Sequence, residues 1–331
     1  MKSSWLAAAL VYTGTVIGAG FASGQEIWQF FARHGTWGAA GALLVTGAAL
    51  AFLSWLAMET GRHDPSLTID KLLHNTYPTW AVPMLDAVVL GFLVIGVAVV
   101  GAGGGTALNH VVHWPVGLGA FITIMATLVV VERGPNAVKW VNTLLLPYLI
   151  VLTLFVSYRT WEWTPQPTPA SSPHEWMLSA LTYLSYNIFT AMAVLMALGR
   201  AMPSPRASLK AALTGTGILV LLATAEVHAL LRLETVRDLP MVDLATLIGR
   251  QWGRLYAMSL WVALFTTGVG EALAIRTHYG RRWLWALVLV VPAAGLPFGQ
   301  LVARLYPVMG AVSLLLWLPL IVNRSKPLRE G

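Results

Sequence analysis

The sequence predicts an all-α integral membrane protein with ten transmembrane helices, arranged as an inverted repeat of five plus five. Three observations support this fold class. First, 57% of the 331 residues are hydrophobic and only 11% are charged, whereas a soluble domain carries about 25% charged residues. Second, ten predominantly apolar runs approach or exceed the roughly 20 helical residues that cross a hydrocarbon core. Third, the longest connections fall at matching places in the two halves of the chain.

The ten runs are bounded by charged residues, Pro, Gly or Trp. Eight of them begin at or beside a Trp, and an amphipathic indole prefers the membrane interface. In chain order, the predicted spans are Trp5–Phe31, Trp37–Met58, Trp80–Leu108, Trp114–Val131, Trp140–Tyr158, Trp176–Leu198, Ala207–Leu231, Gly253–Ala274, Trp283–Phe298 and Leu301–Val322.

The orientation follows from the basic residues, because Lys and Arg are retained on the cytoplasmic side of a membrane. With the N-terminus inside, 14 of the 21 Lys and Arg residues lie in cytoplasmic loops. We therefore expect a multi-pass protein of the cell (plasma) membrane, with both termini in the cytoplasm. The net charge of +7 is then a topology signal, and nucleic-acid binding is not expected.

The connections divide the chain into two halves. The middle long connection, residues 159–175, is Pro-rich and is predicted to be an extracytoplasmic linker. It splits a single transmembrane domain, residues 1–331, into repeats over 5–158 and 176–323. The other two long connections each follow the second span of their half, and each carries a Pro before a short amphipathic stretch. Because five is odd, the second repeat starts on the opposite side of the membrane.

An inverted repeat places the functional site where corresponding helices are interrupted near the midplane. In the first span, Gly14–Gly20 holds three Gly and three β-branched residues, which are poor helix formers. In the sixth span, Tyr183–Phe189 is polar and aromatic at the same depth. We expect helices 1 and 6 to be interrupted there. The alternative for Gly14 and Gly18 is close helix packing, since they also fit a small-xxx-small pattern.

These residues resemble a known family. Gly14-x-x-Ile17-Gly18-x-Gly20 together with Ala263-x-x-Thr266-Thr267 resembles the sodium site of LeuT-type transporters, which belong to the amino acid–polyamine–organocation superfamily. The longer string from Gly14 to Glu26 looks more narrowly like the YkvI-like group of bacterial membrane proteins.

The resemblance implies one Na⁺ as coupling ion and no organic cofactor. The ion would be surrounded by the backbone carbonyls of Gly14, Ile17 and Ala263 and by the hydroxyls of Thr266 and Thr267. An unwound helix frees carbonyl oxygens, and neutral hard oxygens suit a monovalent cation.

The sequence departs from the family at two informative places. Proton-coupled relatives carry a Lys in the fifth span in place of the ion, and Trp140–Tyr158 contains none, which favours sodium. The family's second sodium site uses an Asn where this chain has Phe21, so a second ion is not expected. The outer-gate Arg of the family falls near Gly24, which leaves the outer gate unassigned.

A solute site is expected beside the interrupted first helix. The free N–H groups of an unwound helix favour a carboxylate, and polar aromatic residues accommodate an amine as well. A small organic solute, such as an amino acid or a related amine, is therefore the expected partner. The candidate substrate-binding residues are Ala19, Gly20, Phe21, Gly101, Tyr183, Ser185, Tyr186 and Asn187.

Three carboxyl groups lie well inside predicted spans, away from their ends: Glu26, Glu226 and Glu271. A charge at mid-membrane costs roughly 2.5 to 3.5 kcal/mol on insertion scales, so each is a candidate for a gate or for a proton or cation pathway. The structural alternatives are pairing of Glu26 with Arg33 and of Glu271 with Arg276.

The predicted function is a Na⁺-coupled symporter that works by alternating access. Three alternatives stay open: a proton-coupled transporter of the same fold that uses Glu271 or Glu26, a ligand sensor that does not transport, and a channel. An enzyme is not expected, because the chain has no Cys and shows no hydrolytic arrangement of nucleophile and base.

Overall fold

The computed structural model describes residues 4–67, 71, 76–133, 136–168 and 171–322. This described part is helical and contains no strand. Seven of its helices are long and apolar enough to cross a membrane. The all-α fold class is confirmed, whereas the number of ten crossings and the repeat boundaries stay predictions.

Eight of the ten predicted spans coincide with single helices. In chain order, these are α4 (Gly35–His63), α6 (Val82–Val112), α7 (Val116–Arg133), α8 (Asn136–Arg159), α9 (Pro173–Arg200), α10 (Pro205–Leu230), α12 (Arg250–Tyr279) and α14 (Phe298–Val322).

The first span is broken, as the sequence predicts. It consists of α1 (Trp5–Val16), α2 (Ala19–Ser23) and α3 (Gln25–Phe30), followed by the 3-10 turn η1 (Ala32–His34). Ile17 takes up φ −72° and ψ 84°, which is not helical. The joint between α2 and α3 is Gly24, whose φ of 81° lies in the left-handed region that glycine reaches without steric cost.

The predicted interruption of the sixth span is wrong, because α9 runs without a break from Pro173 to Arg200. The segment around Tyr183 contains no Gly or Pro to release the backbone. Its polar side chains bond back to their own helix instead: Ser185 donates to the carbonyl of Leu181 at 2.7 Å, and Asn187 donates to that of Tyr183 at 2.9 Å. These bonds satisfy the polar groups without unwinding the helix.

The ninth predicted span is not one helix either. It divides into α13 (Arg281–Ala286) and the 3-10 turns η2 (Leu287–Val290) and η3 (Ala293–Gly295). Pro292 and Pro297 lack the N–H that an α-helix needs, so a regular helix does not continue through this segment.

The connection after the seventh span contains the predicted amphipathic helix, α11 (Pro240–Ile248). Its buried face is apolar and includes Met241, Val242, Leu244 and Ala245. The matching stretch of the first half, residues 69–76, lies largely outside the described residues. The Pro-rich linker reaches α10 through Gln166, whose N–H donates to the carbonyl of Leu231 at 2.7 Å.

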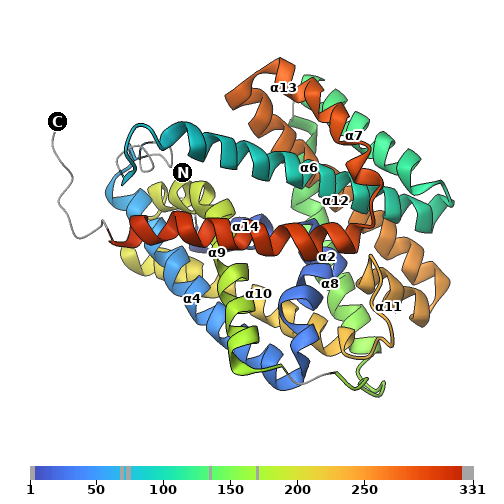
Figure 1. Ribbon diagram of the computed structural model, residues 1–331. Helices are drawn as coiled ribbons and strands as arrows, with labels where there is room; N and C mark the ends of the chain where they lie inside the picture. Colours follow the sequence, from blue (N-terminus) through green and yellow to red (C-terminus); the bar gives the residue numbers. More distant parts are fainter. Residues whose placement is uncertain (1–3, 68–70, 72–75, 134–135, 169–170, 323–331) are drawn as a thin grey trace.

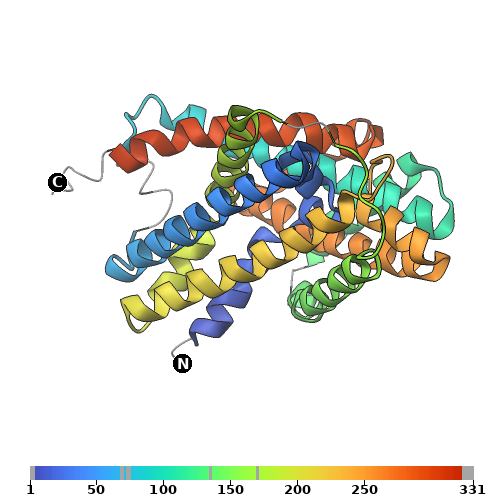
Figure 2. The ribbon, with the colours of Figure 1, turned by 90° about the horizontal axis from the view of Figure 1, so that it is seen from below.

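Helices from the two halves pack against each other (Figures 1 and 2). α4 packs on α9, and α1 packs on α10. The first pair joins spans two and six and the second joins spans seven and one, so replacing each helix by its counterpart in the other half converts one pair into the other. The same replacement relates the pair α6 and α14 to the pair α12 and α8. Figure 2 shows α4 beside α10, and α14 crosses in front of the bundle in Figure 1. An inverted repeat would produce this interlocked arrangement.

The contact between α4 and α9 depends on two glycines. A Cβ at Gly61 would overlap the carbonyl oxygen of Met196, and a Cβ at Gly199 would overlap that of Met58. Each backbone therefore approaches the other at a position that only glycine allows, as small residues do at membrane helix interfaces.

Replacing Gly61 or Gly199 with Ala should lower stability by about 1–3 kcal/mol, because a backbone carbonyl cannot move aside as a flexible side chain does. The measurement is the thermal unfolding midpoint of the detergent-purified protein. Gly91→Ala and Gly217→Ala are matched controls, since a Cβ at either position meets open space. Equal midpoints for all four variants would contradict the close approach.

Candidate functional site

The break in the first span changes the backbone hydrogen bonds around Gly18. The Gly18 N–H donates to the carbonyl of Val16 at 2.8 Å. In a continuous helix, the same N–H would donate to the carbonyl of Gly14, four residues earlier. The Gly14 carbonyl is thus released from the helix, as the predicted ion site requires.

The short helix α2 is held in place by α12 and α8. The hydroxyl of Tyr256 donates to the carbonyl of Ala22 at 3.0 Å, and the hydroxyl of Thr153 lies 2.8 Å from the same Tyr256 oxygen. Tyr256 is completely buried. This chain of bonds fixes α2 directly after the break, and α2 packs against α12.

The predicted hydroxyl ligands are adjacent residues on α12, about one turn after Ala263. Thr266 and Thr267 both donate to the carbonyl of Ala263, at 3.0 and 2.9 Å. Each hydroxyl proton is therefore engaged, and the lone pairs of the two oxygens are left to face a ligand. A pair of hydroxyls in this state accepts a cation rather than an anion. No hydrogen bond among the described residues joins Gly14 or Ile17 to this pair.

Glu26 lies at the turn between α2 and α3. Its side chain is only 2% exposed, and its Oε2 has no hydrogen-bond partner among the described residues. The carboxyl folds back onto Gly20, where an added Cβ would overlap Oε1. Gly20 is thus a place where the carboxyl and the backbone of α2 come together.

Glu226 is completely buried on α10, and neither of its carboxyl oxygens has a partner in the described part of the chain. It lines a cavity of about 10 Å³, roughly the volume that one water molecule requires. The other lining residues come from the helix break and from α8 and α10: Ile17, Phe21, Ala22, Leu149, Ile150, Thr153 and Leu222.

Glu271 lies on another side of the site, against α6. An added Cβ at Gly96 would overlap its carboxyl, and Oε2 lacks a partner among the described residues. The missing side chain at Gly96 therefore makes room for this carboxyl between α6 and α12.

The cations nearest in sequence turn to other partners. Arg33 donates to His34 at 3.4 Å, and Arg276 lies 3.8 Å from Glu132 and donates to the carbonyl of Val131. The described structure therefore supports neither expected pairing, Glu26 with Arg33 or Glu271 with Arg276.

His228 does not form a relay with Glu226. Its ring stacks on Trp161 with 4.1 Å between the ring centroids, and Arg232 lies 2.7 Å from its Nε2. The described structure thus gives Glu226 no histidine partner.

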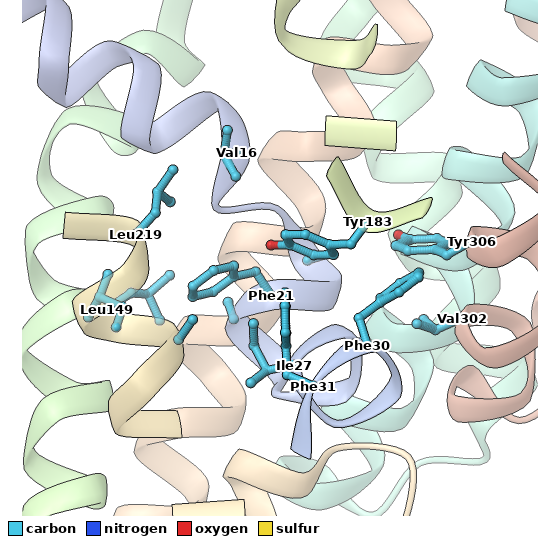
Figure 3. Close-up of a cluster of buried hydrophobic side chains, with 14 of the residues drawn as sticks. Val16, Phe21, Ile27, Phe30, Phe31, Leu149, Tyr183, Leu219, Val302 and Tyr306 are labelled. Carbon is cyan, nitrogen blue, oxygen red and sulfur yellow. The ribbon is translucent and has the colours of Figure 1, made fainter. Parts of the chain in front are cut away.

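A buried tyrosine of α9 packs against the end of the interrupted first span. Tyr183 packs on Phe30 and Phe31, and its hydroxyl points to the side of Phe21 (Figure 3). It lies within electrostatic reach of both Glu26 and Glu226. Of the other substrate residues predicted on α9, Ser185 and Asn187 are engaged with their own backbone.

Tyr186 meets Tyr306 of α14, with 5.0 Å between the ring centroids. Both tyrosines lie within electrostatic reach of Glu26 and Glu271. Gly101, predicted as a substrate wall, lies against Ile124 and Ala294 and is a packing contact with α7 and η3.

Three residues of the site were missed by the sequence analysis: Thr153, Tyr256 and Tyr306. Each is at most 6% exposed although it carries a hydroxyl. Their signal in the sequence is a lone polar residue within an apolar span. That signal identifies a buried hydrogen bond but gives no information about which helix supplies the partner.

The chain is similar to two proteins of Bacillus subtilis (strain 168) over nearly its whole length. It is 28% identical over 328 residues to the membrane protein YkvI, covering 95% of this chain and 94% of YkvI. It is 26% identical over 329 residues to the protein YyaD, covering 95% of each chain. A comparison with protein-family profiles finds no match. The resemblance to YkvI is confirmed, and with the apolar helices it identifies a multi-pass membrane protein.

Solved transporter structures share the fold. The inward-facing conformation of Mhp1 aligns with a TM-score of 0.65 and 11% identity, over 94% of this chain and 74% of Mhp1. MhsT in complex with L-phenylalanine aligns with a TM-score of 0.58 and 15% identity, over 100% of this chain and 84% of MhsT. A manganese transporter of Eremococcus coleocola aligns with a TM-score of 0.52 and 12% identity, over 96% and 71%. The LeuT-type fold is thereby confirmed.

Tyr256→Phe should destabilise the protein by about 1–3 kcal/mol, because it removes the donor to a buried carbonyl and a partner of Thr153. The thermal unfolding midpoint of the purified protein measures the effect. Tyr279→Phe is the matched control, since its hydroxyl donates to the Asp86 carbonyl at an exposed position. A Tyr256→Phe midpoint equal to that of the control would show that α2 does not depend on this bond.

Proposed function

We propose that the protein is a secondary active transporter that moves a small organic solute by alternating access, driven by one Na⁺. The observation that carries the proposal is the break in the first span, which lies inside a LeuT-type fold and releases the Gly14 carbonyl. Unwound backbone at membrane depth is tolerated only where it is buried in protein or lines a cavity. Discontinuous helices of this kind form the solute and ion sites of inverted-repeat transporters.

The sodium assignment rests on the oxygen atoms around the break. The hydroxyls of Thr266 and Thr267 donate to Ala263 and keep their lone pairs available. With the carbonyls of Gly14 and Ile17, they provide neutral oxygens, which suit a monovalent cation better than a divalent one. The carbonyl oxygen of Ala263 accepts a hydrogen bond from each of the two hydroxyls. To bind the ion as well, this oxygen would use the same lone pairs that accept these hydrogen bonds.

Sodium, but not potassium, should raise the thermal unfolding midpoint of the purified protein, because a ligand that binds the folded state stabilises it by mass action. The double substitution Thr266→Ala and Thr267→Ala should abolish this increase. Thr277→Ala, at an exposed position near the end of the same helix, should leave it unchanged. A wild-type protein that is indifferent to sodium would refute the ion assignment.

A proton-coupled transporter is the second candidate, favoured by the buried carboxyls. Glu26 and Glu271 each have an oxygen without a partner among the described residues. A carboxyl in such a site is more stable with a bound proton, or beside a bound cation, than as a free anion. Either carboxyl would then bind a proton on one side of the membrane and release it on the other.

For the second candidate, the expected result is uptake driven by a pH gradient in sodium-free proteoliposomes, and its loss in Glu271→Gln or Glu26→Gln. The solute is one selected by a thermal-shift screen of amino acids and amines. Glu132→Gln, whose carboxyl pairs with Arg281 at 2.9 Å, is the control and should retain uptake. Uptake that requires sodium and ignores the pH gradient would exclude proton coupling.

A further inference from the structure

We propose that the site at the helix break recognises an ammonium group, and that the solute is an organic amine without a free carboxylate. The recognising residues are Glu26 and Glu226. This inference rests on the proposed transport function and narrows its substrate class from amino acids and amines to amines.

The first argument is the charge on the two sides of α2. The Glu26 carboxyl contacts the backbone of α2 at Gly20, and Glu226 lines the cavity formed by Phe21 and Ala22. Gly20 and Phe21 are neighbours on α2, so both carboxyls lie against this short helix. Arg33 and Arg276 engage other groups, and no ion pair among the described residues involves either carboxyl. A buried carboxylate is stable only beside a compensating charge, and an incoming cation would provide it.

The second argument is the cavity itself. Glu226 is completely buried, points into the cavity and has two oxygens without a partner in the described part of the chain. The cavity holds about one water molecule, and an ammonium head is of similar size. The hydroxyl of Thr153 also lines it and adds a neutral acceptor. Three N–H donors of an ammonium would thus meet acceptors of the right kind.

The third argument is the aromatic surface next to the carboxyls. Tyr183 and Phe21 belong to one buried cluster (Figure 3), and Phe21 lines the cavity together with Glu226. Aromatic faces attract desolvated cations. The carbon skeleton of an amine would pack on these rings while its nitrogen lies between the carboxyls.

The same arrangement disfavours an amino acid. The free N–H groups of Ala19, Gly20 and Phe21 are the natural partners of a solute carboxylate, yet Glu26 already lies against Gly20. A second carboxylate there would be repelled by Glu26 and Glu226 together. Like charges brought together in a desolvated site discriminate strongly between otherwise similar ligands.

The test uses pairs of ligands that differ only in the carboxylate: 2-phenylethylamine with phenylalanine, 3-methylbutylamine with leucine, and cadaverine with lysine. Binding to the purified full chain is measured by thermal shift and by calorimetry, with sodium present and absent. In at least one pair, the amine should bind at least 10-fold more tightly than the amino acid. Tighter binding of the amino acids, or no binding by any amine, overturns the proposal.

The variants Glu226→Gln and Glu26→Gln should each weaken amine binding by about 10- to 100-fold, the range for a lost charge-assisted hydrogen bond. Both should fold, because an amide removes an unpaired buried charge, and an unligated midpoint at or above that of the wild type checks this. Glu132→Gln is the control and should bind amines as the wild type does. Unchanged affinity in both site variants overturns the assignment of the carboxyls.

Uptake measurements in proteoliposomes distinguish a failure of the ammonium-site inference from a failure of the proposed transport function. Accumulation of amines against their gradient supports both. Accumulation of amino acids with no amine binding overturns the inference and leaves transport standing. Tight amine binding in a protein that accumulates none of the ligands overturns transport and leaves the ammonium site standing.

Discussion

The structure depends on one constraint: backbone polar groups at membrane depth must find partners within the protein. The break at Ile17 and Gly18 removes helical partners, so neighbouring helices must enclose it. α1 packs on α9 and α10, α2 on α11 and α12, and α3 on α10 and α14. Tyr256 supplies a hydrogen bond to the buried carbonyl of Ala22, near the C-terminal end of α2. Five other helices thus pack around the interrupted first span.

A second consequence of this constraint concerns charge. Tightly packed helices leave little water around the break, so any carboxyl placed there is poorly solvated and needs a bound partner. Glycines create the space for these groups, because Gly20 accommodates Glu26 and Gly96 accommodates Glu271. The same absence of a side chain that allows close helix packing at Gly61 and Gly199 therefore positions acidic groups in the interior. In both cases, a glycine leaves space that a neighbouring group fills: a backbone carbonyl at a helix contact, or a carboxyl in the interior.

The sequence was informative where a local signal sufficed. Apolar runs located the helices, and Gly14 to Gly20 located the break, because glycine and β-branched residues weaken a helix wherever they occur. The sequence misled where tertiary context decides: Tyr183 to Phe189 is polar, but bonds to the helix's own carbonyls keep α9 intact. Pro292 and Pro297 indicate that the ninth span is irregular. The span was predicted as one helix because it is apolar over its whole length. The partners of Tyr256 and Tyr306 lie on distant helices, and no local pattern specifies them.

The continuous α9 has a consequence for how the proposed transporter would move. Ile17 and Gly24 are joints within the first span, and η2 and η3 replace a regular helix in the ninth. α9 has no such joint in the described structure, and Gly61 and Gly199 hold it tightly to α4. Rigid pairs with flexible neighbours favour movement of one body against another. The buried carboxyls Glu26 and Glu226 lie against the interrupted segment, so a cation bound by both would contact α3 and α10. Its binding energy would then differ between conformations, and only such a difference allows a ligand to shift a conformational equilibrium.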